Sequence, residues 1–481
     1  MTDIGFLPAQ LLAGMIRRGK IGCLELLDHY IARIEKYDPT INAVVVRDFD
    51  RARKRARTLD RKGAQTGKLH GVPMTVKESY DIAGLPTTWG VVEKRGDVAE
   101  ANALAVDRLQ AAGAVVFGKT NVPRMLADWQ SFNEIYGVTR NPWNLERAPG
   151  GSSGGSAAAL AAGLTGLETG SDIGGSIRQP AHACGLFGHK PTWGLLPPRG
   201  HAPMPGTAAM TDISVIGPLG RSAGDVALAF DVMAGPDPAD TAMRYVLPRG
   251  PAGLKGLRVA VWAEENSTQT DPEISALLLA LGRHLKREGA KVSVTARPAF
   301  DPRAAFEVYL KLLSGALMAR ASAKEIEATI AGAQKLSADD NSADAVIVRA
   351  VPMLHGTWLA LNEQRHRMRR AWQAFFQDWD VLLCPVHGMA AMPHRHDAPT
   401  HALRITVDGR EIPWNDLLFW PGITCGFHLP ASVAPLGMTK DKLPVGVQIV
   451  GPLYGDRMTL GVAGLLERSW RSFEAPQGWT D

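Results

Sequence analysis

Two serines set among glycines and one lysine at the end of an apolar run are the residues of this chain best suited to chemistry. They are Ser152, Ser176 and Lys77, and residues 72–76 form the apolar run. A serine hydroxyl is a weak nucleophile, so it needs a base within hydrogen-bond reach. A lysine can act as a base only when neutral, and burial against an apolar strand lowers its pKa from about 10.4. These residues therefore allow nucleophilic catalysis if the fold buries the lysine beside the serines.

Short apolar segments alternate with helical ones along the chain. Helical spacing of apolar residues predicts a helix over residues 24–34, and further helices are expected at 103–112 and 157–163. Valine-rich runs predict strands at residues 43–46, 72–76, 114–117, 257–262, 381–384 and 445–450. This alternation is typical of an α/β fold in which helices cover both faces of a sheet. Glycine and proline are concentrated in residues 148–200, which predicts loops that approach backbone or ligand closely.

The composition is that of an ordinary globular protein. Of 481 residues, 45% are hydrophobic and 21% charged, and the net charge is +5. No apolar run reaches the ~20 residues that a membrane helix requires, and the N-terminus has no basic region typical of a secretory signal. We therefore expect a cytoplasmic protein without a membrane association. The cysteines form no CxxC pair, which argues against a disulfide framework or a zinc knuckle: they are Cys23, Cys184, Cys384 and Cys425.

Two glycine motifs match known functional patterns by their letters but not by the structure that is expected around them. Residues 113–120 match the phosphate-loop pattern GxxxxGK[ST], but their central Ala-Val-Val-Phe favours a buried strand and Pro123 follows closely. Residues 150–154 match the G-x-S-x-G nucleophile elbow, which needs a strand immediately before it. Residues 141–149 are polar and irregular, so we expect neither a phosphate loop nor an α/β-hydrolase elbow.

Two further clusters, one of basic residues and one of histidines, are better explained as surface features than as binding sites. The basic residues 51–57 could hold phosphates, but no aromatic residues are interspersed with them, so a solvated helix face is expected and no nucleic-acid partner. A group of histidines has no metal-site spacing and contains prolines, which favours a surface loop and no metal. These histidines are His387, His394, His396 and His401.

The order and spacing of three motifs resemble the amidase signature family. A lysine motif lies at residues 71–78, and the two serine motifs lie at 150–156 and 170–181, with their serines 24 residues apart. Further similarity covers most of residues 65–230 and 380–465 and is weak in 240–375. The resemblance implies the amidase signature fold: a single domain over residues 1–481, built on one large mixed β-sheet core. Its parts would be an N-terminal helical segment (1–64), the catalytic motifs (65–230), a variable, mostly helical region (240–375) and the C-terminal part of the sheet (380–465).

The resemblance also implies roles for individual residues. Ser176 is similar to the nucleophile of the family, Lys77 to its base, and Ser152 to a bridging serine that often follows a cis peptide bond. Ser152 can pass a proton between the other two and later to the leaving amine. The oxyanion hole would consist of backbone N–H groups that can turn toward one point because two glycines lack Cβ. These are the N–H groups of Ile173, Gly174, Gly175 and Ser176.

Residues beside the serine motifs are expected to shape this site. Asp172 would order the oxyanion loop and Arg178 would anchor it. The resemblance places Leu126, Ala127, Asp128 and Trp129 on the acyl side of the cleft, and the alternative is that they pack beneath it. Residues 419–422 and 427–428 would form the opposite wall. Phe427 and His428 are inserted relative to the usual family sequence, so the substrate of a relative does not transfer.

The predicted function is that of an amidase, a serine amidohydrolase of linear or aryl amides with esters as side substrates, which needs no cofactor and no metal. Its partner would be a small-molecule amide, and the family suggests a homodimer. One alternative is the glutaminase subunit of a tRNA-dependent amidotransferase complex. Another is a binding protein that keeps the fold without catalysis. The sequence leaves open which amide is hydrolysed and on which side of the bond it is recognised.

Overall fold

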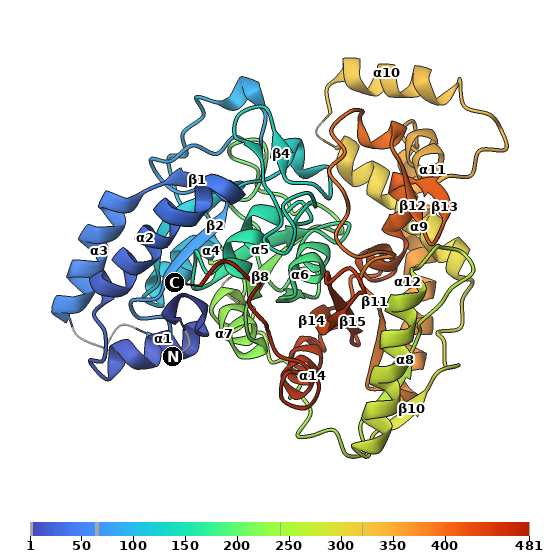
Figure 1. The fold of residues 1–481 in the computed structure, drawn as a ribbon. Coiled ribbons are helices and arrows are strands. Elements are labelled where there is room, and N and C mark those ends of the chain that lie inside the picture. Colours follow the sequence, from blue (N-terminus) through green and yellow to red (C-terminus); the bar gives the residue numbers. More distant parts are fainter. Residues whose placement is uncertain (1–2, 63–66, 241, 320, 481) are drawn as a thin grey trace.

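An eight-stranded sheet forms the centre of the molecule, and helices cover both of its faces (Figure 1). The computed structural model describes residues 3–62, 67–240, 242–319 and 321–480. The expected boundary between the N-terminal segment and the catalytic motifs, at residues 64 and 65, lies outside these described residues, as do Met1 and Thr2.

The central sheet is mixed. Its first three strands run parallel, and each following neighbour runs antiparallel to the one before. The order across the sheet is β10 (Lys291–Ser293), β9 (Arg258–Val261), β11 (Val381–Pro385), β15 (Pro444–Val450), β14 (Ala431–Met438), β7 (Phe187–Lys190), β8 (Val215–Gly220) and β6 (Glu168–Asp172).

A smaller sheet lies beside β6, the last strand of the central sheet. In it β3 (Val115–Thr120) pairs with β1 (Val44–Arg47) on one side and with β2 (Pro73–Lys77) on the other. The Thr75 N–H donates to Thr165 Oγ1 at 2.9 Å, and the Gly166 N–H donates to the Pro73 carbonyl at 3.1 Å. Through these bonds the first half of β2 lies next to the segment that leads into β6.

Helices pack on both faces because side chains of successive strand residues point to opposite sides. Along β11, Val381 and Leu383 pack with α7, α8 and α14, whereas Leu382 and Cys384 pack with α9, α12 and α13. The helices are α1 (Ala9–Arg17), α2 (Cys23–Ile41), α3 (Phe49–Lys62), α4 (Leu104–Ala111), α5 (Gly154–Ala161), α6 (Arg178–Cys184), α7 (Ala223–Met233), α8 (Pro272–Arg287), α9 (Pro302–Met318), α10 (Ala323–Ala333), α11 (Ala343–Arg349), α12 (His355–Asp378), α13 (Phe419–Cys425) and α14 (Asp456–Ser469).

Short elements complete the chain around the central sheet. Two hairpins are formed by β4 (Phe132–Asn133) with β5 (Gly137–Val138) and by β12 (Arg404–Val407) with β13 (Arg410–Pro413). The 3-10 helices are η1 (Ile4–Phe6), η2 (Val92–Lys94), η3 (Arg124–Leu126), η4 (Thr400–Ala402) and η5 (Trp414–Leu418).

The predicted α/β fold class, with a large mixed sheet between helices, is confirmed. Each predicted strand is present, but residues 43–46, 72–76 and 114–117 belong to the smaller sheet because β3 pairs only with β1 and β2 among the described strands. The sequence predicts the strands themselves and not their pairing, which depends on contacts between distant segments. No helix in the described ranges is long and apolar enough to cross a membrane.

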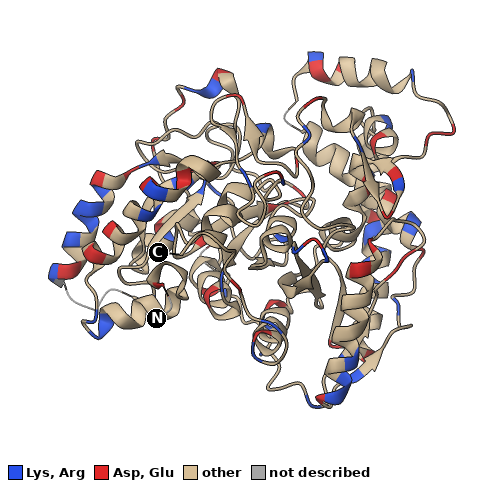
Figure 2. Ribbon diagram, in the orientation of Figure 1, with Lys and Arg blue, Asp and Glu red and all other residues tan. Residues whose placement is uncertain are grey.

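The basic run at residues 51–57 lies on α3, as predicted, and three of its basic side chains have local partners (Figure 2). Arg51 pairs with Asp48 at 2.5 Å and Arg53 with Asp28 at 2.7 Å. Arg55 donates to the Ala114 carbonyl at 2.9 Å. The run is therefore a helix face with its own ion pairs.

Candidate active site

Lys77 ends the buried strand β2, and its amine is surrounded by hydroxyl groups. Its Nζ lies 2.7 Å from Ser152 Oγ and 3.0 Å from both Ser153 Oγ and Ser171 Oγ. The side chain is fully buried, and within the described residues no carboxylate contacts it. Three hydroxyl groups can satisfy the amine in either protonation state, because each hydroxyl can both accept and donate a hydrogen bond. Full burial of the side chain favours the uncharged form.

Burial lowers the pKa of Lys77 well below its ordinary value, and the negative charges of Asp172 and Glu168 oppose this only in part. An ammonium buried without a charged partner costs several kcal/mol, so the group releases its proton instead. Glu168 is itself buried, and this burial raises its pKa to about 7, against hydrogen bonds from Thr75 and Thr169. The surroundings of Lys77 therefore favour the form of lysine that can accept a proton.

Ser152 lies in the turn that leads into α5. The Gly151–Ser152 peptide bond is cis, as the family resemblance implied. A Cβ on Gly151 would lie 2.5 Å from the Asp128 carbonyl, and one on Gly155 would lie 2.3 Å from the Asn121 nitrogen. Larger residues cannot fit here, so glycines let the chain bring Ser152 against Lys77. The next N–H along, that of Ser153, donates to the Ser176 carbonyl at 3.2 Å and joins the two serine motifs.

Ser176 lies in the loop between β6 and α6, and Asp172 shapes this loop. The Asp172 carboxylate accepts the N–H of Gly175 at 2.8 Å and that of Ile177 at 3.1 Å. Gly175 has a φ of +102°, a conformation that other residues rarely adopt. The prediction that Asp172 orders the loop is therefore confirmed.

Arg178 anchors this arrangement from within the core. It donates to both oxygens of Asp172, through Nε at 2.9 Å and Nη2 at 2.8 Å, and both side chains are fully buried. Burial would raise the pKa of Asp172, but the Arg178 guanidinium holds it well below its usual range. Arg178 also donates to the Pro421 carbonyl at 3.1 Å and to Thr424 Oγ1 at 2.6 Å, which ties the loop to α13.

The backbone N–H groups of the loop divide into two sets. The Gly175 N–H is used by Asp172, whereas those of Ile173, Gly174 and Ser176 have no hydrogen-bond partner within the described part of the chain. Two backbone carbonyls of the loop accept hydrogen bonds from side chains. Trp129 Nε1 donates to the Gly174 carbonyl at 3.1 Å, and the Tyr309 hydroxyl donates to the Ile173 carbonyl at 3.1 Å. Fixed carbonyls orient the N–H groups that follow them, which is what an oxyanion hole requires.

Ser176 lines a cavity of 1090 Å³ together with Leu126, Ala127, Asp128 and Trp129. The structure thus brings the four predicted acyl-side residues to the serine. Trp129 is also packed, because its ring meets that of His387 edge-on with centroids 5.0 Å apart. The rest of the wall comes from α9, α10, α11, the β12–β13 hairpin and η5.

Comparison with known proteins identifies this arrangement. The Amidase family model matches residues 25–460. The chain belongs to the amidase family. It is 32% identical to an indoleacetamide hydrolase of Bradyrhizobium diazoefficiens, over 95% of this chain and 85% of that protein. It is also 32% identical to an acylamidase of Rhodococcus erythropolis, over 100% of this chain and 97% of that protein.

The fold is similar to that of a bacterial aryl acylamidase of the amidase signature enzymes, with a TM-score of 0.82 and 24% identity over 98% of this chain and 99% of that one. The resemblance carried by the three sequence motifs is therefore confirmed. A glutamyl-tRNA(Gln) amidotransferase subunit from Synechococcus is similar to the chain as well, so membership in the amidase family does not by itself separate the two predicted activities.

The predicted opposite wall of the cleft is wrong in part. Phe427 is buried in the core and stacks on Phe300 with ring centroids 5.9 Å apart, and His428 lines a different cavity. Residues 419–422 lie in α13, where Trp420 packs against Trp262. The wall instead comes from the region that resembles the family least, because its amphipathic helices turn apolar residues such as Leu313 and Leu317 toward the cavity.

The two glycine motifs adopt the local structures that the sequence predicted. Residues 115–120 of the phosphate-loop match form β3, and no strand immediately precedes residues 150–154, all of which are described. In the described residues no group of three or more metal-ligating side chains is placed to hold an ion. The loop prediction holds for His394 and His396, whereas His401 lies in η4 and lines the cavity of Ser176. His387 is fully buried because it packs against Trp129.

Sequence reasoning missed three residues of the site: Ser153 and Ser171, which contact the Lys77 amine, and Tyr309. Tyr309 is buried on α9, and its hydroxyl holds the Ile173 carbonyl. A Cβ on Gly422 would lie 2.5 Å from its ring, so the helix α13 passes directly against it. Nothing in the local sequence distinguishes Tyr309 from an ordinary core tyrosine, since its partner lies 136 residues away.

Replacing Asp172 tests whether this carboxylate holds the loop. Asp172→Asn leaves Arg178 buried without a charged partner, which costs about 3–5 kcal/mol in the free energy of unfolding. Because the pKa of Asp172 is depressed in the folded state, its contribution is complete above the unfolded pKa of about 3.9 and is lost as pH falls further. Urea denaturation should show the largest difference from wild type at neutral pH and a smaller one below about pH 4.

The control is Asp397→Asn, which removes an exposed carboxylate paired with Arg395 at 2.8 Å. It should leave the urea midpoint unchanged. Equal midpoints for Asp172→Asn and wild type at neutral pH would show that the ion pair does not hold the loop.

Proposed function

We propose that this protein is an amidase in which Ser176 attacks the amide carbonyl and Lys77 is the base, with Ser152 relaying the proton. The observation that carries the proposal is the buried Lys77 amine, 2.7 Å from Ser152 Oγ and without a carboxylate contact in the described residues. The family and its amide-hydrolysing relatives support the reaction class. Amide bonds need both a strong nucleophile and a protonated leaving amine, and one relay supplies both.

The reaction takes two stages. Ser176 Oγ bonds to the carbonyl carbon as its proton passes to Ser152, whose own proton passes to Lys77 Nζ. The C–N bond then breaks, and the amine leaves with a proton returned from Lys77 through Ser152. Water attacks the acyl-enzyme by the same relay, which releases the carboxylic acid and restores Ser176. Charge on the carbonyl oxygen is stabilised by the N–H groups of Ile173, Gly174 and Ser176, at ~3 kcal/mol for a typical donor.

The N–H group of Gly175 was expected to bind the oxyanion, but in this proposal it does not. Its N–H is bonded to Asp172, and a Cβ on it would lie 2.9 Å from Pro421. Gly175 therefore shapes the loop, and the three neighbouring N–H groups bind the oxyanion.

The acyl part of the substrate occupies the cavity lined by Leu126, Ala127, Asp128 and Trp129. Apolar side chains from α9, including Leu313, add to this wall. An apolar or aromatic acyl group fits such a lining. The similarity to an indoleacetamide hydrolase and an acylamidase supports a small-molecule amide of this kind.

Asp128 gives the cavity a polar anchor. Its Oδ1 atom is buried and, like Trp414 Nε1 on the same cavity, has no hydrogen-bond partner in the described ranges. Burial raises the pKa of Asp128 to about 7, opposed by the N–H groups of Trp129 and Gln130 and by the indole of Trp414, which lies near the carboxylate without making a hydrogen bond of normal geometry. A buried polar atom without a partner is costly, so a substrate that supplies the partner is favoured. Asp128 therefore selects acyl groups that carry a hydrogen-bond donor, and best of all a cation.

A glutaminase subunit of an amidotransferase complex is not favoured. Arg51 and Arg53 of the basic run, which could approach tRNA, already pair with Asp48 and Asp28, and amide-hydrolysing relatives are similar to the chain over nearly its whole length. The cytoplasmic location, the single domain and the homodimer of the sequence analysis stay predictions.

Mutation of the relay tests the proposed mechanism. On a panel of acyl p-nitroanilides, Ser176→Ala and Lys77→Met should each reduce kcat by a factor of about 10⁴ or more, because members of a catalytic unit fail together. Phenylmethylsulfonyl fluoride should label wild type at Ser176, as read by peptide mass spectrometry. The matched control is Lys119→Met, a buried lysine on β3 whose Nζ donates to Thr87 Oγ1 at 2.9 Å. It should keep its activity, and activity of Lys77→Met at the level of Lys119→Met would refute the relay.

Substrate selection by Asp128 can be measured with two p-nitroanilides whose acyl chains have equal length and end in a methyl or an amino group. The preference of wild type in kcat/KM for the ammonium-ended chain should rise as pH passes about 7, where Asp128 ionises. Asp128→Asn should lower kcat/KM for that chain by about 10-fold to 100-fold, the size expected for a charge-assisted hydrogen bond. The methyl-ended chain should be little affected.

Asp340→Asn serves as the control, because Asp340 lines the same cavity while its carboxylate already accepts the Ser342 N–H at 2.9 Å. The same preference in wild type and Asp128→Asn would remove Asp128 from substrate recognition without affecting the relay.

A further inference from the structure

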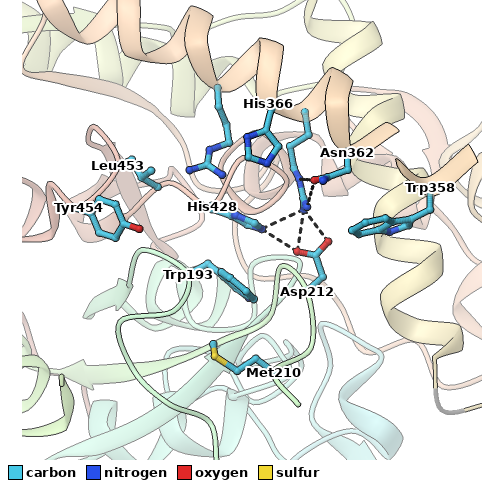
Figure 3. A pocket seen from close by; sticks show the side chains of 11 residues that line it. Trp193, Met210, Asp212, Trp358, Asn362, His366, His428, Leu453 and Tyr454 are labelled. Atoms are coloured by element: carbon cyan, nitrogen blue, oxygen red, sulfur yellow. Dashed lines mark hydrogen bonds and ion pairs between the residues drawn. The ribbon is translucent and has the colours of Figure 1, made fainter. Parts of the chain in front are cut away.

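A second cavity, of 420 Å³, lies apart from the one that contains Ser176 (Figure 3). No described residue lines both cavities. As Figure 3 shows, Trp358, Asn362 and His366 reach into it from α12, and Trp193, Met210 and Asp212 face them from the segment between β7 and β8. His428 and the loop before α14 close the remaining side.

The centre of this cavity is a buried ion pair. Arg365 Nη1 donates to both oxygens of Asp212, at 2.9 and 2.7 Å, and His428 Nε2 lies 2.9 Å from Asp212 Oδ1. Arg365 is 4% exposed. Burial lowers the pKa of His428 to about 4, so at neutral pH the imidazole is uncharged. Asp212 is thus neutralised by Arg365 and adds no net charge to the cavity.

A further guanidinium lines the cavity without such a partner. Arg369 lies one turn after Arg365 on α12, and no carboxylate in the described residues contacts it. Burial lowers the pKa of Arg369, and the positive charge of Arg365 lowers it further. Burial likewise lowers the pKa of His366, which favours its neutral form. The cavity therefore carries one uncompensated positive charge, at Arg369.

Flat apolar side chains line the same cavity as Arg369. Trp193 stacks on His428 with ring centroids 4.8 Å apart and planes 16° apart, and Trp358 lies 5.9 Å from the Arg365 guanidinium. Tyr454 and Leu453 complete the lining. An aromatic wall beside a guanidinium can hold a flat ring through apolar contact while the guanidinium binds a carboxylate through two parallel hydrogen bonds.

We propose that this cavity is a binding site for a small planar organic carboxylate, with Arg369 as its counter-ion and Trp193 and Trp358 as its apolar walls. The planar fork of an arginine matches a carboxylate, and a bound anion supplies the negative charge that the cavity lacks. The aromatic lining favours an organic anion above inorganic phosphate, which has no apolar surface to bury. This site is independent of the proposed function, because it shares no described residue with the cavity of Ser176.

Isothermal titration calorimetry of the full chain with benzoate, acetate and inorganic phosphate tests the proposal. Benzoate should bind at one site, and more tightly than acetate or phosphate. Arg369→Gln should weaken benzoate binding by about tenfold or more, the usual effect of losing a charge-assisted contact. The matched control is Arg370→Gln, the exposed neighbour on the same helix, which does not line the cavity and should bind as wild type does.

The melting temperatures of Arg369→Gln and Arg370→Gln should equal that of wild type, because neither arginine has a charged partner to lose among the residues that the structure describes. Benzoate binding of equal strength in wild type and Arg369→Gln would place the anion elsewhere, for example at the Ser176 cavity, and would overturn the proposal. Failure of benzoate to bind wild type would overturn it as well. Tighter binding of phosphate than of benzoate would refute the planar organic ligand.

Discussion

The fold buries the amine of Lys77 and, over the residues described, keeps carboxylates out of contact with it. Two carboxylates, those of Asp172 and Glu168, lie near enough to favour the charged form of the amine, but each already accepts hydrogen bonds from other groups. Asp172 is bound by Arg178 through two hydrogen bonds, and Glu168 accepts hydrogen bonds from Thr75 and Thr169. Three hydroxyl groups are left as the contacts of the amine. Because hydroxyl groups can accept or donate, they suit a group that must gain and lose a proton.

The Asp172–Arg178 pair also connects the parts of the site. Asp172 fixes the turn at Gly175, and Arg178 reaches the Pro421 carbonyl and Thr424 on α13. The same helix passes against Tyr309 of α9, whose hydroxyl holds the Ile173 carbonyl. The loop that carries Ser176 is therefore held by the core of the sheet on one side and by the cavity helices on the other.

The sequence predicts the parts of the site that depend on local chemistry. Lys77 ends a fully buried strand, and the glycines around Ser152 and Ser176 leave no room for side chains, so these motifs could be found without the structure. The cavity wall could not, because Leu313 and Leu317 on an amphipathic helix fit a core as well as a cleft. The second cavity could not be predicted from the sequence either, because its charged residues come from distant segments of the chain. The strand pairing of the smaller sheet was missed for the same reason.

The central claim is that Lys77 is neutral in the folded protein at neutral pH, and nuclear magnetic resonance of lysine labelled with ¹³C at Cε measures this directly. The Lys77 signal, assigned by its loss in Lys77→Met, should have the chemical shift of an uncharged amine at pH 7, while exposed lysines remain charged until about pH 10.4. A Lys77 signal that titrates together with the exposed lysines would contradict the account.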